Sequence, residues 1–138
     1  MTTAGAADPL AAVHQYIQAF NDGDVTAMSA IFDDEGAVLD GMAPHVWSGP
    51  SAVEHWYRDV MTKSAHLGAS DYVVAVDEPL HHDVSEDTAY LVFPASLDSR
   101  LNGAPVVQTG AIFTVALRRR AGDWRIAAWT WTKGTVQQ

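Results

Sequence analysis

The sequence predicts a single α+β domain, because helical spacing dominates its first half and strand alternation its second. Between residues 8 and 64 apolar side chains recur every three or four positions, whereas from residue 72 onward they alternate every second position. Helices followed by an antiparallel meander is the element order of an α+β fold. We expect residues 1–138 to form one domain, with residues 1–7 as a flexible N-terminus.

Three helices are expected, and capping side chains mark where the first two begin. The first begins at Asp8-Pro9, because aspartate accepts hydrogen bonds from free N–H groups and proline fits the first turn. Asn21-Asp22-Gly23 ends this helix, and Asp24 caps a short second one. A third helix is expected from Ser51 to about Ser64.

A short strand and four longer ones complete the predicted fold. An acidic turn over residues 33–36 leads into a strand over residues 37–40, between the second and third helices. Asn102-Gly103 and Ala121-Gly122-Asp123 predict two hairpins, and Pro94 predicts an edge position or a bulge. The longer strands are expected over residues 72–76, 89–97, 106–117 and 124–132.

The last strand predicts a homodimer. Strict alternation puts Trp129 and Trp131 on one face and Trp124, Ile126 and Ala128 on the other. A sheet that is apolar on both faces needs two covers. Helices would supply one cover, and a second subunit would supply the other.

Composition and charge narrow the classes of function. The net charge of −9 disfavours binding to nucleic acid or to a membrane surface, and we expect Arg118-Arg119-Arg120 to be a solvated hairpin end. The chain has no cysteine, so disulfides and thiolate chemistry are excluded. The start MTTAGAADPL lacks a signal-peptide pattern, and a cytoplasmic protein is expected.

Asp40 is the main candidate for chemistry. It ends a short apolar strand, and an apolar surrounding disfavours the charged form of a carboxylate, which makes a usable general base. The alternative is an aspartate that caps the Gly41–Pro44 turn. His45 lies five residues later, either as an acid–base partner at a pocket rim or as an exposed loop histidine.

These elements resemble the NTF2-like superfamily, specifically its SnoaL-like and ketosteroid-isomerase-like branch. The resemblance implies a cone in which three helices pack on a curved, mostly antiparallel sheet around an apolar pocket. Its motifs appear as Tyr16 with Gly23-Asp24, Phe32-Asp33-Asp34-Glu35, Trp47-Ser48-Gly49 and Trp124-Arg125-Ile126-Ala127-Ala128-Trp129.

The resemblance to ketosteroid isomerases also implies roles for single residues. Asp40 corresponds to the proton-shuttling aspartate, Tyr16 to the tyrosine that donates to the oxyanion, and Tyr57 to a supporting tyrosine. Two positions depart from that pattern. Phe32 replaces a tyrosine, and Ala111 replaces the second oxyanion donor, so steroid isomerisation itself is disfavoured.

The predicted ligand is a small hydrophobic compound that carries a carbonyl group. No metal-binding spacing such as His-Glu-x-x-His occurs, nor a glycine-rich phosphate loop, so no cofactor is expected. Three hypotheses stay open: a proton-transfer enzyme, a binding module without catalysis, and a dimerisation domain with a filled cavity. The expected pocket wall comprises Phe20, Trp56, Ala111, Phe113, Trp129 and Trp131.

Overall fold

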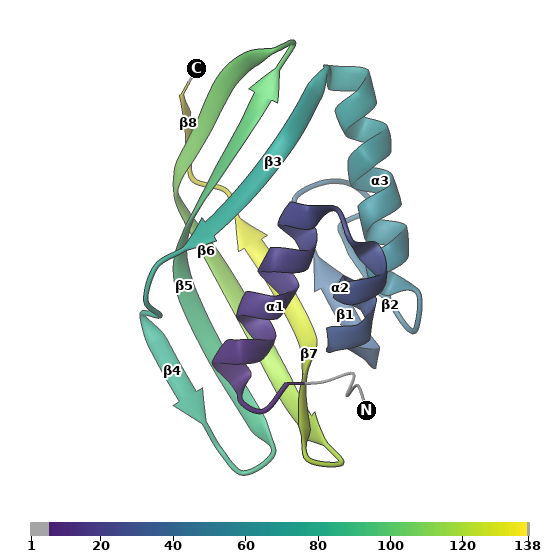
Figure 1. Ribbon diagram of the computed structural model, residues 1–138, viewed down its shortest axis with the longest axis vertical. Helices are drawn as coiled ribbons and strands as arrows, with labels where there is room; N and C mark the ends of the chain where they lie inside the picture. Colours follow the sequence, from purple (N-terminus) through teal and green to yellow (C-terminus); the bar gives the residue numbers. More distant parts are fainter. Residues whose placement is uncertain (1–5, 138) are drawn as a thin grey trace.

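The computed structural model describes residues 6–137, and it confirms an α+β fold with three helices on one face of a curved sheet (Figure 1). The helices are α1 (Pro9–Asp22), α2 (Val25–Ile31) and α3 (Ala52–Leu67). None of the helices in this range is long and apolar enough to cross a membrane. The strands are β1 (Phe32–Leu39), β2 (Val46–Ser48), β3 (Ala69–Val76), β4 (His81–Val84), β5 (Thr88–Leu101), β6 (Ala104–Arg120), β7 (Asp123–Thr132) and β8 (Thr135–Gln137).

The N-terminal segment falls mostly outside the described residues. The prediction of a flexible N-terminus concerns residues 1–7, of which residues 1–5 are not described. Ala6 is buried and pairs with Trp124, with a hydrogen bond from each backbone N–H to the other residue's carbonyl at 3.0 and 2.9 Å.

The predicted helix caps are confirmed. Asp8 Oδ1 accepts a hydrogen bond from the Ala11 N–H at 2.8 Å, and Asp24 Oδ1 accepts one from Ala27 at 3.0 Å. Gly23 ends α1 with φ of 70°, a left-handed conformation that glycine adopts without strain. Because of that turn α2 lies beside α1 on the same face of the sheet (Figure 1).

The two longest strands, β5 and β6, run the length of the curved sheet (Figure 1). The sheet order is β2-β1-β7-β6-β5-β3, with β4 also paired to β5 and β8 to β6. The predicted hairpin at Asn102-Gly103 joins β5 to β6, and both residues have positive φ, as a two-residue type I′ turn requires. Pro94 lies where the outer partner of β5 changes from β4 to β3, next to a shift in register after Ala95.

The strand predictions missed three short strands and misplaced one turn. Residues 33–36, expected as a turn, belong to β1 and form an irregularity in its pairing with β7. The missed strands β2, β4 and β8 have three or four residues each, and every residue of β4 and β8 is exposed. Strands this short or this exposed show no clear alternation of apolar and polar residues, so the sequence carried no signal for them.

The predicted two-faced last strand is wrong, because β7 contains a bulge. Leu117 pairs with Ile126 while the adjacent Ala116 pairs with Ala128, which leaves Ala127 as an extra residue. The extra residue reverses the alternation after it. All the large apolar side chains of β7 therefore share the helix-covered face with Phe113, Val115 and Leu117 of β6; they are Trp124, Ile126, Trp129 and Trp131.

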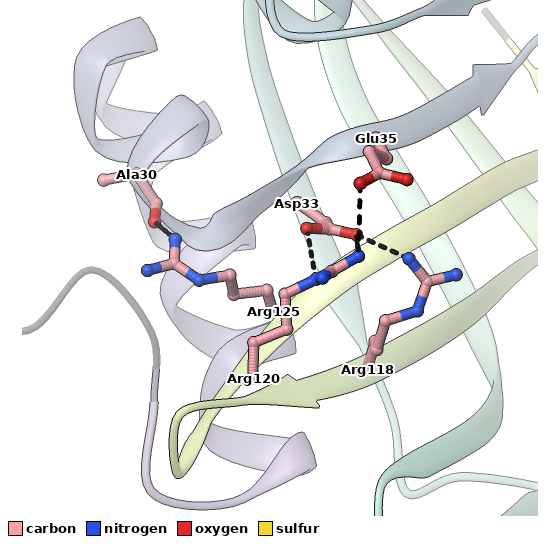
Figure 2. Close-up of polar contacts among 6 residues, drawn as sticks. All are labelled: Ala30, Asp33, Glu35, Arg118, Arg120 and Arg125. Carbon is pink, nitrogen blue, oxygen red and sulfur yellow. Dashed lines mark hydrogen bonds and ion pairs between the residues drawn. The ribbon is translucent and has the colours of Figure 1, made fainter.

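The arginine run lies at a hairpin end and is half-exposed, as expected, but two of its side chains also cover a buried carboxylate. Asp33 is 3% exposed, and its carboxylate pairs with Arg118 at 2.7 Å and with Arg120 at 2.9 Å (Figure 2). Glu35 adds a longer contact to Arg120 at 3.7 Å. The hairpin end of β6 is thereby tied to the bulged start of β1, a contact between residues 85 positions apart.

Removing both arginines should destabilise the protein strongly. Arg118→Met with Arg120→Met leaves the buried Asp33 carboxylate without a counter-charge, at a cost of about 3–5 kcal/mol in unfolding free energy. Asp33→Asn should cost less, because the half-exposed guanidinium groups can turn to water. Urea denaturation measures both.

Arg58→Met is the matched control, since Arg58 is exposed and lies 3.8 Å from Asp59. Its effect should stay within about 0.5 kcal/mol. An arginine double variant as stable as this control would contradict a structural role for the Asp33 pair.

Candidate functional site

A cavity of about 470 Å³ lies between the helices and the concave face of the sheet. This volume is within the usual range of small-molecule sites. Its apolar wall is formed by Ile17, Phe20, Met42, Trp56, Val60, Val74, Leu97, Phe113, Trp129 and Trp131. The polar and charged lining residues are Tyr16, Asp40, Lys63, Tyr72, Gln108 and Lys133.

Aromatic side chains from four elements pack against one another in the wall. Trp56 of α3 meets Trp129 of β7 edge to face, with ring centroids 4.8 Å apart and planes at 87°. Phe20 of α1 and Phe113 of β6 flank this pair at 5.8 Å from Trp56 and 5.5 Å from Trp129. The edge-to-face geometry of the Trp56–Trp129 pair is one that aromatic rings favour, and the two flanking pairs are tilted.

Tyr16 is a buried side chain that lines the cavity and can donate a hydrogen bond. The indole N–H of Trp129 donates to its hydroxyl oxygen at 2.8 Å, and no acceptor for the Tyr16 proton occurs among residues 6–137. Burial raises the pKa of Tyr16 well above 10; the Trp129 bond offsets this in part, and the negative charge of Asp40 adds to it. Tyr16 is therefore a neutral phenol with a proton to donate.

Asp40 lines the same cavity with its carboxylate held by two donors. Oδ1 accepts from the Gly41 backbone N–H at 2.7 Å, and Oδ2 accepts from the Trp56 indole N–H at 2.8 Å. The first bond is the turn cap that we considered as the alternative role. The second fixes the carboxylate against the aromatic wall, so both descriptions hold for one half-buried side chain.

The other polar lining residues differ in what they offer a ligand. Ser64 Oγ donates to the Val60 carbonyl at 2.7 Å, so the Tyr72 hydroxyl 2.6 Å away must donate to Ser64. Tyr72 thus has no proton left for a ligand. Gln108 Oε1 accepts from the Trp131 indole and from the Gly134 N–H, at 2.9 and 3.0 Å.

The two bonds to Gln108 settle the orientation of its amide. Both partners are N–H donors, so the atom between them is the oxygen. The Gln108 NH₂ group has no acceptor among residues 6–137 and is a second donor lining the cavity. In the same range no group of three or more His, Asp or Glu side chains is placed to hold a metal ion.

The comparisons with known proteins establish the family. The profile of the SnoaL-like domain matches residues 10–130. The chain belongs to the SnoaL-like family. None of the curated proteins matches its sequence.

Solved structures with a similar fold confirm that the fold of this chain resembles that of NTF2-like proteins. A hexachlorocyclohexane dehydrochlorinase from Novosphingobium barchaimii LL02 is 13% identical, with a TM-score of 0.76 over 93% of this chain and 88% of the other. A ketosteroid isomerase-like protein from Erwinia carotovora atroseptica SCRI1043 is 22% identical, with a TM-score of 0.69 over 90% and 92%. An NTF2-like protein of unknown function from Pseudomonas putida KT2440 is 17% identical, with a TM-score of 0.68 over 89% and 82%. These identities show the fold alone.

Seven of the ten predicted site residues line the cavity of this SnoaL-like protein. They are Asp40, Tyr16, Phe20, Trp56, Phe113, Trp129 and Trp131. The other three, Tyr57, His45 and Ala111, lie outside its lining.

The contacts of these three residues show where they lie instead. Tyr57 packs edge to face on Phe20 at 6.2 Å and lines a separate hollow of about 410 Å³. His45 is exposed, and its Nδ1 lies 3.0 Å from the Asp40 backbone carbonyl rather than from the carboxylate. Ala111 is fully buried opposite Ala95 and is not part of the cavity lining.

Sequence reasoning missed four polar residues of the site. Gln108, Tyr72 and Lys133 lie in or after strands and carry no motif, so nothing in their spacing pointed to a pocket. Lys63 did carry a signal. It follows Trp56 by seven residues and Val60 by three, which places it on the same helical stripe.

The buried Tyr16 makes a pH-dependent prediction. At pH 8, Tyr16→Phe should lower the unfolding free energy by about 1–3 kcal/mol, because the Trp129 indole loses its acceptor. At pH 11 the difference should shrink by about 1.4 kcal/mol, since Tyr16 ionises in the unfolded wild type but not in the folded one. The contribution of Tyr16 to the unfolding free energy is thus fully present below pH 10 and is lost progressively above it.

Urea denaturation at both pH values measures the two differences. Tyr90→Phe, which removes a hydroxyl from a half-exposed side chain, is the matched control and should have little effect at either pH. A Tyr16→Phe difference that is the same at pH 8 and pH 11 would show that Tyr16 is not held as a neutral phenol.

Proposed function

We propose that this protein binds a small apolar carbonyl compound in the cavity and transfers a proton within it. Asp40 acts as the base, and Tyr16 donates a hydrogen bond to the carbonyl oxygen. The observation that carries the proposal is that these two side chains, one an anionic acceptor and one a neutral donor, line the same apolar cavity.

The chemical step uses these two groups in complementary roles. Asp40 removes a proton from the carbon next to the carbonyl: the C–H bond breaks, an O–H bond forms on the carboxylate, and the electron pair moves to the carbonyl oxygen. The Tyr16 hydroxyl stabilises the negative charge that develops on that oxygen. Protonated Asp40 then returns the proton to another atom of the ligand, which completes an isomerisation or a related reaction.

The arrangement favours a substrate that makes a less demanding oxyanion than a steroid dienolate. Phe32 and Ala111 supply no hydrogen-bond donor where the resemblance to ketosteroid isomerases implies one. Removal of one oxyanion donor lowers a rate by about 10²–10³. The dehydrochlorinase and the isomerase-like protein with the same fold support the assignment of a proton-transfer class.

The alternative is a binding module that holds the ligand without turning it over. The hydrogen bond from the Gly41 N–H to Asp40 favours this alternative, because a purely structural aspartate makes the same bond. A dimerisation domain filled by its own side chains is disfavoured by the volume of the cavity, about 470 Å³.

Deuterium exchange into 2-tetralone, an apolar ketone, separates the two functions. Wild-type protein in D₂O should speed exchange at the carbon beside the carbonyl, and Asp40→Asn should lower the protein-dependent rate by about 10²–10⁴. NMR follows the exchange. Calorimetry measures the binding of 2-naphthol, which mimics the enol of this ketone. The Asp40→Asn substitution should change its dissociation constant by less than about threefold.

Tyr57→Phe is the matched control, since this hydroxyl lies outside the cavity lining. Its exchange rate should equal that of the wild type. If wild-type protein binds 2-naphthol yet exchanges no faster than Asp40→Asn, the protein is a binding module.

We also propose that the protein is a homodimer, now on the evidence of the opposite face of the sheet. The side chains on this face in the middle of β6 and β7 are uncharged and half-buried, and no helix among residues 6–137 covers them. They are Ile112, Thr114 and Ala116 of β6 with Ala128 and Thr130 of β7. A second copy would bury this face by two-fold symmetry.

Analytical ultracentrifugation tests the dimer. Wild-type protein at micromolar concentration should sediment as a dimer, and Thr114→Lys should shift it to a monomer, because a buried lysine opposes its own copy across the axis. Thr62→Lys, on the exposed side of α3, is the matched control and should leave the dimer intact. A monomeric wild type would refute the proposal.

A further inference from the structure

Both lysines of this chain line the cavity. The protein has 17 acidic residues and two lysines, Lys63 and Lys133, which are 70 positions apart in the sequence. Tertiary structure brings both to the wall of the same cavity, where the one acidic lining residue is Asp40. An acidic protein that places all its lysines at one apolar cavity has a local positive charge there.

Neither lysine is neutralised by the protein. Among residues 6–137 no carboxylate lies within 4.0 Å of either ammonium group, although acidic residues outnumber basic ones by 17 to 8. This holds for Asp40 as well, which lines the same cavity but forms no ion pair with either lysine. The two ammonium groups are therefore available to a ligand.

The lysines lie at positions that continue the apolar wall. On α3 the lining residues Trp56, Val60 and Lys63 follow one another at four and three positions, so they share one stripe of the helix. Lys63 is the exposed end of that stripe. A long lysine side chain on such a stripe covers apolar surface with its methylene groups and keeps its charge at the solvent edge.

The second lysine lies beside the free amide donor. Lys133 directly precedes Gly134, whose N–H donates to Gln108 Oε1, and follows Trp131, whose indole donates to the same oxygen. The Gln108 amide is thus packed against the segment that carries Lys133, with its NH₂ group unused. An ammonium and an amide N–H from this region are both suited to an anion's oxygen atoms.

We propose that the ligand carries an anionic group, a carboxylate or a phosphate ester, that binds Lys63 and Lys133 with help from Gln108. This inference rests on the proposed function, because it adds an anionic end to the same apolar carbonyl compound. The carbonyl end lies inward at Tyr16 and Asp40, and the anionic end lies at the exposed lysines. The predicted substrate class is therefore an apolar oxo acid or a phosphorylated equivalent.

Three naphthalene probes of similar size test the inference by calorimetry. They are 1-naphthaleneacetate, 1-naphthyl phosphate and the neutral 2-(1-naphthyl)ethanol. At least one anion should bind wild-type protein about tenfold more tightly than the alcohol, since a charged hydrogen bond adds to the same apolar contact. Whichever anion binds more tightly identifies the source of the charge. Raising NaCl from 20 to 500 mM should weaken binding of the anions and leave the alcohol unchanged.

Lys63→Met and Lys133→Met should each weaken binding of the preferred anion by about three- to tenfold and change binding of the alcohol by less than about twofold. Arg58→Met removes a positive charge from the helix that carries Lys63, but outside the cavity lining, and should change the binding of neither probe. The anionic site would be overturned, and the proposed function left intact, if all three probes bound equally or if the lysine variants bound the anions as tightly as Arg58→Met does. If neither the alcohol nor either anion bound, the anionic site and the proposed function would both be overturned.

Discussion

The hydrogen bond from the Trp129 indole to the Tyr16 hydroxyl is the contact on which the site depends. It joins β7 to α1 in the interior, where an unpaired indole N–H would cost about 1–3 kcal/mol. Because the hydroxyl oxygen is used as an acceptor, its proton points elsewhere. The same bond therefore stabilises the contact between helix and sheet and leaves a donor for the cavity.

That bond exists because of one extra residue in the sheet. Without the bulge at Ala127, Trp129 would lie on the opposite face from Ile126, and the aromatic wall would lose the ring that contacts Trp56, Phe113 and Tyr16. The bulge is packed closely against β1. A Cβ on Gly36 would lie 2.8 Å from the Ala127 carbonyl oxygen, so only glycine fits there. Local irregularity in the backbone thus determines which side chains meet in the cavity.

The partners of a charged or polar side chain determine whether it is structural or available to a ligand. Asp33 is buried but fully paired with Arg118 and Arg120, which makes it a structural carboxylate. Asp40 is held by uncharged donors and keeps a face toward the cavity. The tyrosines divide in the same way, because Tyr72 gives its proton to Ser64 whereas Tyr16 retains its own. Residue type alone does not distinguish the members of either pair.

The sequence by itself determined the elements whose signals are local. Caps at Asp8 and Asp24, the helical stripes and the Asn102-Gly103 turn depend on neighbours within a few positions, so they were predicted correctly, and with them the α+β fold and most of the aromatic wall. Tertiary structure alone decided the rest. A bulge is specified by the register of adjacent strands, and an ion pair such as Asp33 with Arg118 spans 85 positions. The gathering of both lysines at one cavity likewise depends on contacts across the whole fold, for which local spacing holds no information.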